Sequence, residues 1–515
     1  MASPVSLPLT FACAALLSFS ADAIALPRVG LRRSPGALAL HIVSVVFVAC
    51  LICALTRRPY FSAFIALALV GLMSGVSNAK YASLREPFVF TDLSLFSQLF
   101  AHPRLYLPFL SMQTVVAIVA GVLLLAGGFF LDAAAPAHVA ADCALAAAAF
   151  LLIGYALAAR LRLTLDPLED QRHHGFFAVF VAYLLNGMRS STFRGFECAM
   201  SASPFAKAFE PKDRPDIIVI QSESFFDARA LGDKKIEASL YAHFDTALRE
   251  SATHGELDVP AWGANTMRSE FALLSGIASA KLGYARFYPY AFVRRTCASL
   301  ANWFHRAGYE TVAIHPYHAD FFGRDRVFPL LGFDRFLDIR AFANAHRAGP
   351  YISDESVIDR IVKELDSSRS KPAFIFAMTM ENHGPLHLET VETGESSRYH
   401  NLGEDPAFKD LTAYLRHIAN ADAMIGRLLA HLRARRRDTV LCFYGDHVPA
   451  LPHVFERLGT VPSRSHYFIW RNFGDRAARK QDRAVEDLGA ALLHTMETAG
   501  GREVAASVSE RTEQL

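Results

Sequence analysis

A carboxylate and an imidazole stand side by side at the end of a short apolar run near the carboxyl terminus. Residues 440–443 have the composition of a strand that is covered on both faces of a parallel sheet. Gly445 would let the backbone turn sharply where that strand ends, and Asp446 and His447 follow directly. An oxygen and an imidazole nitrogen that face one point suit Zn²⁺ or Mn²⁺. For this pair alone, the structural alternative is a cap and a surface histidine.

A second carboxylate follows a second apolar run. Residues 217–220 are Ile-Ile-Val-Ile, and Glu223 comes three residues after them. Open α/β sheets keep their ligand sites at the carboxyl ends of their strands, so we expect Glu223 at the same sheet edge as Asp446. Taken alone, Glu223 is equally compatible with the N-cap region of a helix.

A hydroxyl stands at the start of a short predicted helix within residues 263–276, which begin and end with glycine. Thr266 falls near the helix N-terminus, where unpaired backbone N–H groups and the helix dipole favour an anion such as phosphate. Its hydroxyl can act as a nucleophile if a metal lowers its pKa. The structural alternative is that Thr266 or Asn265 is only an N-cap.

Two histidines and an arginine follow further predicted strands. His315 comes directly after the strand predicted at residues 310–314, and Arg324 lies nine residues later, a pattern that can form a phosphate cradle. His383 follows a strand predicted at residues 374–378. A lone histidine is more often structural. Polar clusters at several strand ends of one sheet are better explained by one shared site.

Length and composition indicate more than one domain. The chain has 515 residues, of which 52% are apolar, and the excess lies before about residue 163. A net charge of +2 does not indicate the strongly basic surface of a nucleic-acid-binding protein, so no nucleic-acid partner is expected. Four of the seven cysteines fall in apolar stretches, so a disulfide framework is not indicated, although a Cys198–Cys297 bridge stays open.

We predict a five-helix transmembrane domain over residues 1–163. Five stretches approach the roughly 20 apolar residues that cross a bilayer as a helix. The first of them could instead be a cleaved signal peptide, because Ala21, Ala23 and Ala25 are small, although its start carries no positive charge. The predicted spans are residues 7–26, 37–55, 61–77, 107–131 and 143–159.

The rest of the chain divides into a connection, a large domain and a tail. Residues 164–213 are predicted as an interfacial helix followed by a linker from residue 187. The helix is apolar at 176–185 but too short to cross, so it could lie along the membrane surface or pack under the next domain. Residues 214–500 alternate short β-rich runs with helical stretches, which predicts an α/β domain with a mainly parallel sheet flanked by helices. Residues 501–515 are predicted to be loosely ordered.

Together these motifs resemble those of the lipoteichoic acid synthase and phosphoglycerol transferase family, in the alkaline phosphatase and sulfatase superfamily. The resemblance includes the order and spacing of the motifs across residues 216–449, and the predicted spans before them. Phe322 is a departure, because family members can have tryptophan there; the ring keeps a stacking face but lacks an N–H donor, which leaves the head group open. The matching motifs are Gln221-Ser-Glu-Ser-Phe225, Asn265-Thr-Met-Arg-Ser-Glu-Phe271, His315 with Phe322 and Arg324, Glu381-Asn-His-Gly-Pro385 and Tyr444-Gly-Asp-His447.

The resemblance implies a sulfatase-like domain that transfers phosphoglycerol from a phosphatidylglycerol-like lipid to a glycan or polyol through a phospho-threonine. One divalent metal is implied, with Mn²⁺ favoured slightly by the mixed ligands and Mg²⁺ or Zn²⁺ open. Thr266, His383 and Arg324 would be catalytic, and His315 and Phe322 would bind the substrate together with Arg324 and His383. The implied metal ligands are Glu223, Thr266, Asp446 and His447.

Orientation in the membrane is predicted from the resemblance rather than from charge. Lys and Arg occur in nearly every loop, and the one loop without them, between the last two spans, would by the positive-inside rule place the large domain inside. The family works on lipid head groups at the outer face of the cytoplasmic (inner) membrane. We therefore expect a multi-pass protein whose catalytic domain is extracytoplasmic, or periplasmic.

The alternatives to phosphoglycerol transfer are a sulfatase, a phosphoethanolamine transferase and a membrane-anchored binding pseudoenzyme. A sulfatase needs a C/S-x-P-x-R motif, which is absent from the sequence. A phosphoethanolamine transferase resembles the sequence more closely than a sulfatase does. Those enzymes usually carry several disulfides in the soluble domain, however, and Cys198, Cys297 and Cys442 cannot supply them. A membrane-anchored binding pseudoenzyme would be indicated by the loss of a metal ligand, and none is lost.

Overall fold

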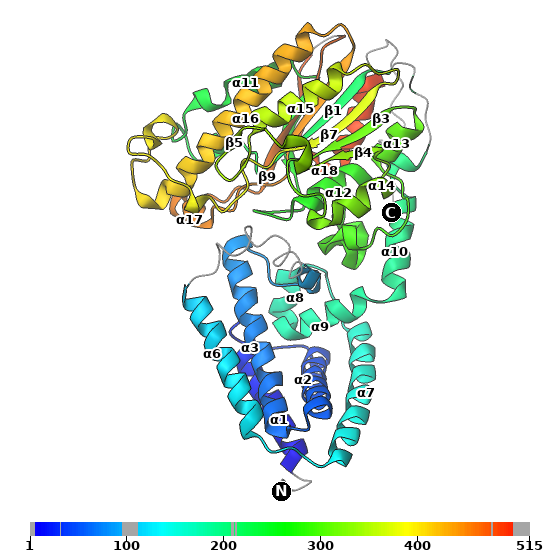
Figure 1. Cartoon of the computed structure of the whole chain (residues 1–515), viewed down its shortest axis with the longest axis vertical. Helices are drawn as coiled ribbons and strands as arrows, with labels where there is room; N and C mark the ends of the chain where they lie inside the picture. Colours follow the sequence, from blue (N-terminus) through cyan, green and yellow to red (C-terminus); the bar gives the residue numbers. More distant parts are fainter. Residues whose placement is uncertain are drawn as a thin grey trace. The chain divides into compact units, whose positions relative to one another are not determined.

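The computed structural model describes residues 6–30, 32–94, 112–207, 211, 214–474 and 477–497. By its internal contacts the chain forms two compact units (Figure 1). A helical unit comprises Met1–Phe196 together with Leu282–Tyr288, and an α/β unit comprises Glu197–Lys281 and Pro289–Leu515. The predicted tail at residues 501–515 lies outside the described residues.

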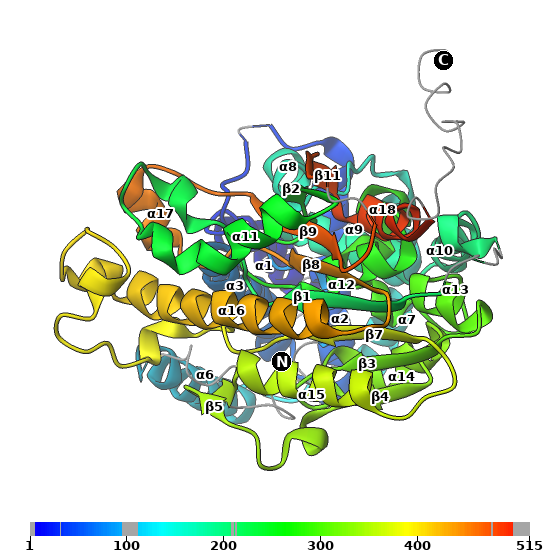
Figure 2. The same cartoon turned by 90° about the horizontal axis from the view of Figure 1, so that it is seen from above.

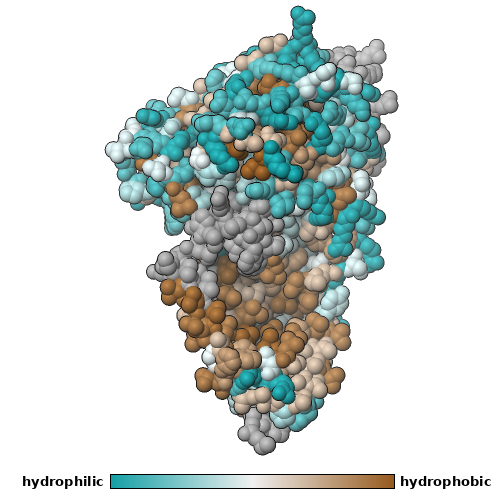
Figure 3. Space-filling view, viewed as in Figure 1, coloured by the Kyte–Doolittle hydropathy of each residue, from teal (hydrophilic) through white to brown (hydrophobic). Residues whose placement is uncertain are grey.

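The helical unit has an apolar surface, which Figure 3 shows as a brown band. Within the described residues, α2, α3 and α7 are long and apolar enough to cross a membrane, whereas α1 and the part of α6 from Val119 are shorter. The five predicted spans fall on helices where they are described, except that the first, 7–26, extends beyond the end of α1 at Asp22. A count of five stays a prediction, and residues 107–111 lie outside the described part. The helices are α1 (Ser6–Asp22), α2 (Pro35–Thr56), α3 (Pro59–Leu84), α6 (Met112–Leu131), α7 (Ala137–Arg160), α8 (Pro167–His174), α9 (Phe176–Gly187) and α10 (Ser190–Ser201).

The predicted interfacial helix and linker take a different form. The apolar helix α9 packs against α2 and α7, and its Phe176, Phe177 and Phe180 are buried in the core of the helical unit. A helix that is apolar on most of its faces is expected to be buried in this way. Where the sequence predicted a linker from residue 187, α10 is helical, because Phe196 and Met200 lie one turn apart and are both buried.

A short segment from the second half of the sequence belongs to the helical unit. Tyr284 lies in the segment Leu282–Tyr288; its hydroxyl is 3.1 Å from Asn186 Nδ2, and its ring meets that of Tyr183 edge-on. The Phe287 ring stacks on the ring of Tyr183, with 5.1 Å between centroids. The helical unit is therefore completed by residues that follow it by about ninety positions in sequence.

The α/β unit is built on one nine-stranded mixed sheet in the order β10-β2-β9-β8-β1-β7-β3-β4, with β11 also pairing β2. Its centre is parallel from β8 through β4, while β9 runs antiparallel to β8 and β2. The strands are β1 (Asp216–Ser222), β2 (Thr253–Asp258), β3 (Glu310–Ile314), β4 (Arg335–Leu337), β7 (Ala373–Met378), β8 (Thr439–Gly445), β9 (Arg464–Arg471), β10 (Arg479–Lys480) and β11 (Arg483–Ala484), beside a separate β5 (Arg347–Ala348) and β6 (Tyr351–Ile352) pair.

Helices cover the sheet, with α15 and α16 side by side along it (Figures 1 and 2). Ile218 of β1, Phe443 of β8 and Leu429 of α16 belong to one buried apolar cluster. Helices α12, α13 and α18 pack on one another or on β3. The helices are α11 (Ala242–Glu250), α12 (Thr266–Ser275), α13 (Leu300–Arg306), α14 (Arg324–Leu330), α15 (Asp354–Asp366), α16 (Lys409–Ala434), α17 (Pro452–Leu458) and α18 (Val485–Glu497).

The structure confirms the predicted class of a helical apolar region followed by an α/β domain with a mainly parallel sheet. The predicted strands at 217–220, 310–314, 374–378 and 440–443 correspond to β1, β3, β7 and β8. All seven cysteines lie in the described residues and are free, so Cys198 and Cys297 form no bridge.

Candidate metal centre and its surroundings

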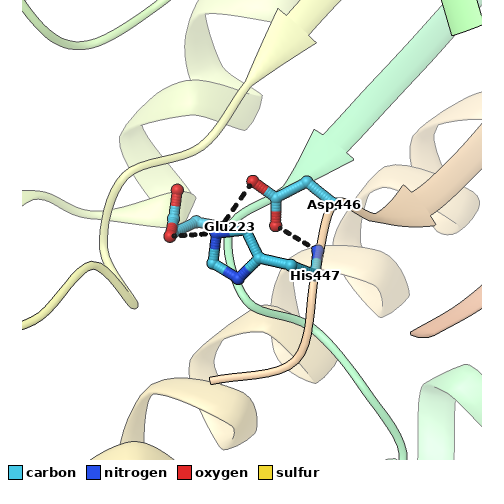
Figure 4. Close-up of side chains that lie close together, drawn as sticks. All are labelled: Glu223, Asp446 and His447. Carbon is cyan, nitrogen blue, oxygen red and sulfur yellow. Dashed lines mark hydrogen bonds and ion pairs between the residues drawn. The ribbon is translucent and has the colours of Figure 1, made fainter. Parts of the chain in front are cut away.

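The register of two neighbouring parallel strands brings the predicted metal ligands together. Ser222 of β1 pairs with Gly445 of β8, so Glu223 and Asp446 leave adjacent strands at the same level. Figure 4 shows Glu223, Asp446 and His447 converging, and one ligand atom from each lies within 4.8 Å of the others. The two strand ends therefore bring together three of the predicted metal ligands.

Gly445 serves close approach rather than a sharp turn. Gly445 does not have a positive φ, so the sharp turn predicted from the sequence is not what requires glycine here. A Cβ atom at this position would lie 1.9 Å from the carbonyl oxygen of Phe225, far inside van der Waals contact. Only glycine lets the chain after β1 pass this close to the end of β8.

Asp446 is buried and uses its two oxygens differently. Oδ1 accepts hydrogen bonds of 2.8 Å from the backbone N–H groups of Ser224 and His447. Oδ2 is buried and accepts no hydrogen bond in the structure. Burial, with a further contribution from Glu223, raises the pKa of Asp446 to about 7 although His447 opposes it. The surface alternative is therefore wrong for this pair, because Asp446 and His447 are at most 1% exposed.

His447 presents one defined nitrogen to the centre. Its Nδ1 lies 2.9 Å from the backbone carbonyl of Val448, so Nδ1 carries the proton and Nε2 holds the lone pair. Burial lowers the pKa of His447, but the carboxylates of Asp446 and Glu223 outweigh burial and raise it overall.

Thr266 is the first residue of α12, as the glycine-led turn predicted. Its Oγ1 lies 3.4 Å from His447 Nε2 and 3.5 Å from Glu223 Oε2. The preceding Asn265 occupies the N-cap position with φ 67° and makes no capping hydrogen bond through its side chain. This left-handed backbone turns the threonine hydroxyl and the helix N-terminus toward the same point as the carboxylates.

The donor set fits one divalent ion. Atoms about 2.1 Å from a tetrahedral metal lie roughly 3.4 Å from one another. The observed separations match, because Glu223 Oε1 and Asp446 Oδ2 lie 3.5 Å and 3.6 Å from His447 Nε2. The buried Asp446 Oδ2, which has no hydrogen bond, is the atom that an ion would satisfy.

Arg324 and His315 lie together, deep in the α/β unit. Arg324 Nη1 is 3.3 Å from His315 Nε2, and the two side chains are nearly fully buried. Burial, followed by the charge of Arg324 and the nearby His383, lowers the pKa of His315 well below its usual value, so the ring is neutral and accepts from the arginine. The Phe322 ring lies 5.2 Å from the Arg324 guanidinium carbon, and its backbone has φ 58°.

His383 lies on the loop after β7 and is half-buried. Its Nδ1 is 2.7 Å from the carbonyl of Gly384, so Nδ1 carries the proton and Nε2 is the nitrogen that can exchange one. The Tyr351 hydroxyl is 3.2 Å from the same Nδ1. On this loop Thr379 Oγ1 accepts from the backbone N–H of Glu223, which joins the loop to the carboxylate end of β1.

The sequence reasoning missed Glu270 and His417. Glu270 is fully buried and bonds Arg324, and its spacing of one helical turn from Thr266 was the available signal. His417 lies between the carboxylates of Glu381 and Glu389, at 2.9 Å from each. Nothing in the local sequence pairs residues 417, 381 and 389, because the partners come from α16 and from the long segment before it.

Comparison with known proteins places the chain in a family. The sulfatase family model matches residues 215–498, which is more than half of the chain, so the protein belongs to the sulfatase family. This match confirms the predicted superfamily and agrees with the metal centre at the strand ends.

The chain is similar to several known proteins. The chain is 27% identical to the capsular polysaccharide biosynthesis protein RkpI of Rhizobium meliloti over 472 residues, covering 86% of this chain and 84% of that protein. It resembles the phosphoethanolamine transferase EptA of Neisseria meningitidis with a TM-score of 0.55 and 13% identity, over 96% of both chains. The structure of the phosphoglycerol transferase GacH of Streptococcus pyogenes, solved with sn-glycerol-1-phosphate, matches with a TM-score of 0.48 and 20% identity. This match covers 60% of this chain and 81% of that one.

Proposed function

We propose that this protein transfers a phosphoglycerol group from a phosphatidylglycerol-like membrane lipid to a glycan or glycerophosphate acceptor. The observation that carries the proposal is the position of the Thr266 hydroxyl at the start of α12, 3.4 Å from His447 Nε2 and 3.5 Å from Glu223 Oε2. A hydroxyl among metal-ligand atoms and at a helix N-terminus is well placed to attack a phosphate ester.

The metal would be held by Glu223, Asp446, His447 and Thr266 itself. A divalent ion there would lower the pKa of the threonine hydroxyl and offset negative charge on the phosphoryl oxygens. Two carboxylates, a hydroxyl and one imidazole favour Mn²⁺ slightly, with Mg²⁺ and Zn²⁺ as the alternatives.

The reaction has two displacements that share Thr266. In the first, Thr266 Oγ bonds to phosphorus, the bond from phosphorus to the diacylglycerol oxygen breaks, and diacylglycerol leaves with a proton. Glycerophospho-threonine remains. In the second, an acceptor hydroxyl bonds to phosphorus, the bond to Thr266 Oγ breaks, and the threonine regains its proton.

The neighbouring side chains have separate tasks in this proposal. Arg324 offsets charge on the phosphoryl oxygens, with His315 beside it at 3.3 Å. His383 exchanges a proton through Nε2, because Nδ1 already donates to Gly384. Phe322 supplies an aromatic face for the head group.

Other observations support the proposed membrane location and the proposed glycan acceptor. The apolar helices α2, α3 and α7 would hold the protein where a lipid donor is found. Likeness to a protein named for capsular polysaccharide biosynthesis supports a glycan acceptor. We propose a multi-pass protein of the cytoplasmic (inner) membrane whose α/β unit is periplasmic.

Phosphoethanolamine transfer is the second candidate, favoured by the fold likeness to EptA over nearly the whole chain. The absence of any disulfide among the seven cysteines favours phosphoglycerol instead. The two candidates differ in the donor lipid, so a donor comparison separates them.

The test uses the full-length protein in detergent with Mn²⁺ and head-group-labelled phosphatidylglycerol, and follows release of diacylglycerol. We expect release by the wild type and at least a 10³-fold loss in Thr266→Ala. Thr246→Ala is the matched control, because the Thr246 hydroxyl donates to Ala242 and accepts from Arg249, which both lie on the same helix, α11. Release from phosphatidylethanolamine alone would establish the second candidate, and no release from either lipid with metal bound would indicate a binding pseudoenzyme.

A further inference from the structure

The Arg324 side chain is buried and is paired with a single carboxylate. Its Nε lies 3.0 Å from Glu270 Oε1 and its Nη2 lies 2.8 Å from Glu270 Oε2, a side-on bidentate pair. The arginine and glutamate side chains are 1% and 0% exposed. The pairing fixes the plane of the guanidinium and turns its Nη1 edge toward His315.

Glu270 is itself held by two further donors. The Tyr290 hydroxyl donates to Oε1 in a short hydrogen bond, and Gln221 Nε2 lies 3.4 Å from Oε2. Burial and the charge of Glu270 raise the pKa of Tyr290 well above its usual value, so this hydroxyl stays a donor. The Tyr444 hydroxyl in turn donates to Gln221 Oε1.

This network connects the elements that carry the metal ligands. Gln221 lies two residues before Glu223 on β1, and Tyr444 lies two residues before Asp446 on β8. Glu270 follows Thr266 by four residues on α12, which places the two side chains on the same helix face. The arginine is thus tied to the nucleophile's helix and to both ligand-bearing strands.

We propose that Glu270 is a positioning residue that holds Arg324 in register with Thr266 for binding of a phosphoryl group. The inference rests on the proposed function, because it assigns Arg324 to that group. Stability alone gives no reason for the arrangement, since a buried ion pair is often no more stabilising than apolar residues of the same volume. Fixed geometry does give a reason, because a misplacement of about 1 Å can cost roughly 10²-fold in rate.

A double-mutant cycle of Glu270→Gln and Arg324→Met in the full-length, Mn²⁺-loaded protein tests the proposal. Each single variant is expected to lower kcat for diacylglycerol release by about 10²-fold. If Glu270 acts through Arg324, the double variant falls no more than about threefold below Arg324→Met. Losses that multiply to roughly 10⁴-fold would overturn the proposal, because they show that the two residues act independently.

A milder variant covers the case in which Glu270→Gln fails to fold around an unpaired arginine. Tyr290→Phe removes one hydrogen bond to Glu270 and is expected to lower kcat several-fold, with no further loss when Arg324→Met is present. Tyr241→Phe is the matched control, because Tyr241 is equally buried but bonds the backbone of Phe226 instead. An equal loss of kcat in both tyrosine variants would overturn the proposal.

A second readout separates this inference from the proposed function. Inorganic phosphate binding to the same variants is measured by calorimetry. A wild type that releases no diacylglycerol would end the proposed function, while non-additive losses of phosphate affinity across the cycle would still support Glu270 as a positioning residue. Additive losses, or a wild type that binds no phosphate, would overturn the inference itself.

Discussion

Ser222 of β1 lies directly opposite Gly445 of β8 in the parallel ladder. The residue after each of them, Glu223 and Asp446, is a predicted metal ligand, so the separation of the two carboxylates is set by strand register. A slip of one residue would turn every side chain of one strand to the other face. The geometry of the candidate metal centre is therefore set by the apolar pattern that fixes the register of the two strands.

Asp446→Asn should abolish metal binding while leaving the fold intact. The amide oxygen can still accept from Ser224 and His447, but the charge at the buried Oδ2 is lost. We expect the affinity for Mn²⁺, measured by calorimetry, to fall by at least about 10²-fold. Asp422→Asn is the control, because Asp422 is a buried carboxylate that bonds the backbone of α11. A similar loss in that variant would contradict the assignment.

Metal removal should lower stability as well as activity. An ion that binds only the folded state adds about 2.7 kcal/mol when its concentration is 100 times Kd. Chelation is therefore expected to lower the unfolding temperature of the wild type and to leave Asp446→Asn almost unchanged. A thermal melt with and without a chelator measures this; an equal shift in the two proteins would place the stabilising ion elsewhere.

His417 should make stability fall as the pH rises above neutrality. Burial lowers its pKa, but hydrogen bonds to Glu381 and Glu389 outweigh burial and raise the pKa to about 9. The folded state therefore holds a proton that the unfolded chain releases near pH 6.5, so the stabilisation is complete below that pH and is lost as the pH rises through 9. Up to about 3 kcal/mol is involved. Urea midpoints from pH 6 to 10 measure the loss, and His417→Gln should flatten it; the same slope in both proteins would refute the assignment.

Gly445→Ala should disrupt the strand end. The new Cβ would meet the backbone carbonyl of Phe225, which cannot move aside as a flexible side chain would. We expect a loss of at least about 1–3 kcal/mol in the free energy of unfolding, together with weaker metal binding. Gly195→Ala is the matched control, because no atom lies within 4 Å of its added Cβ. If the two variants proved equally stable, the close approach would not matter.

Asp216→Asn should destabilise the amino-terminal edge of the sheet without touching the metal centre. The fully buried Asp216 carboxylate lies 3.0–3.2 Å from Arg369, Arg435 and Arg437. Removing its charge leaves three guanidinium groups without a buried counter-charge, which costs about 3–5 kcal/mol. Chemical unfolding measures the loss. Asp359→Asn, at an exposed pair, should change stability by less than about 1 kcal/mol, and equal effects would contradict the prediction.

The predictable part of this fold is the part that local pattern determines. Strands β1, β3, β7 and β8 were found because each contains a run of apolar residues, and Thr266 was placed at a helix start by the preceding glycine. The grouping of Glu223, Asp446 and His447 followed from the rule for strand ends.

The unpredicted part depends on contacts distant in sequence. Glu270 and Arg324, which form a salt bridge, are 54 residues apart in sequence. Asp216 forms ion pairs with arginines from two different loops. The antiparallel direction of β9 depends on its neighbours β8 and β2 rather than on its own residues. The sequence also gave no sign that Leu282–Tyr288 would join the helical unit.

The segment Leu282–Tyr288 also affects how the α/β unit could be produced as a soluble fragment. A chain cut at residue 214 would keep Tyr284 and Phe287 but lose Tyr183 and Asn186, their partners. Two aromatic rings would be exposed to water and would favour aggregation during purification. No single cut separates the two units cleanly, so a fragment would need polar replacements at positions 284 and 287.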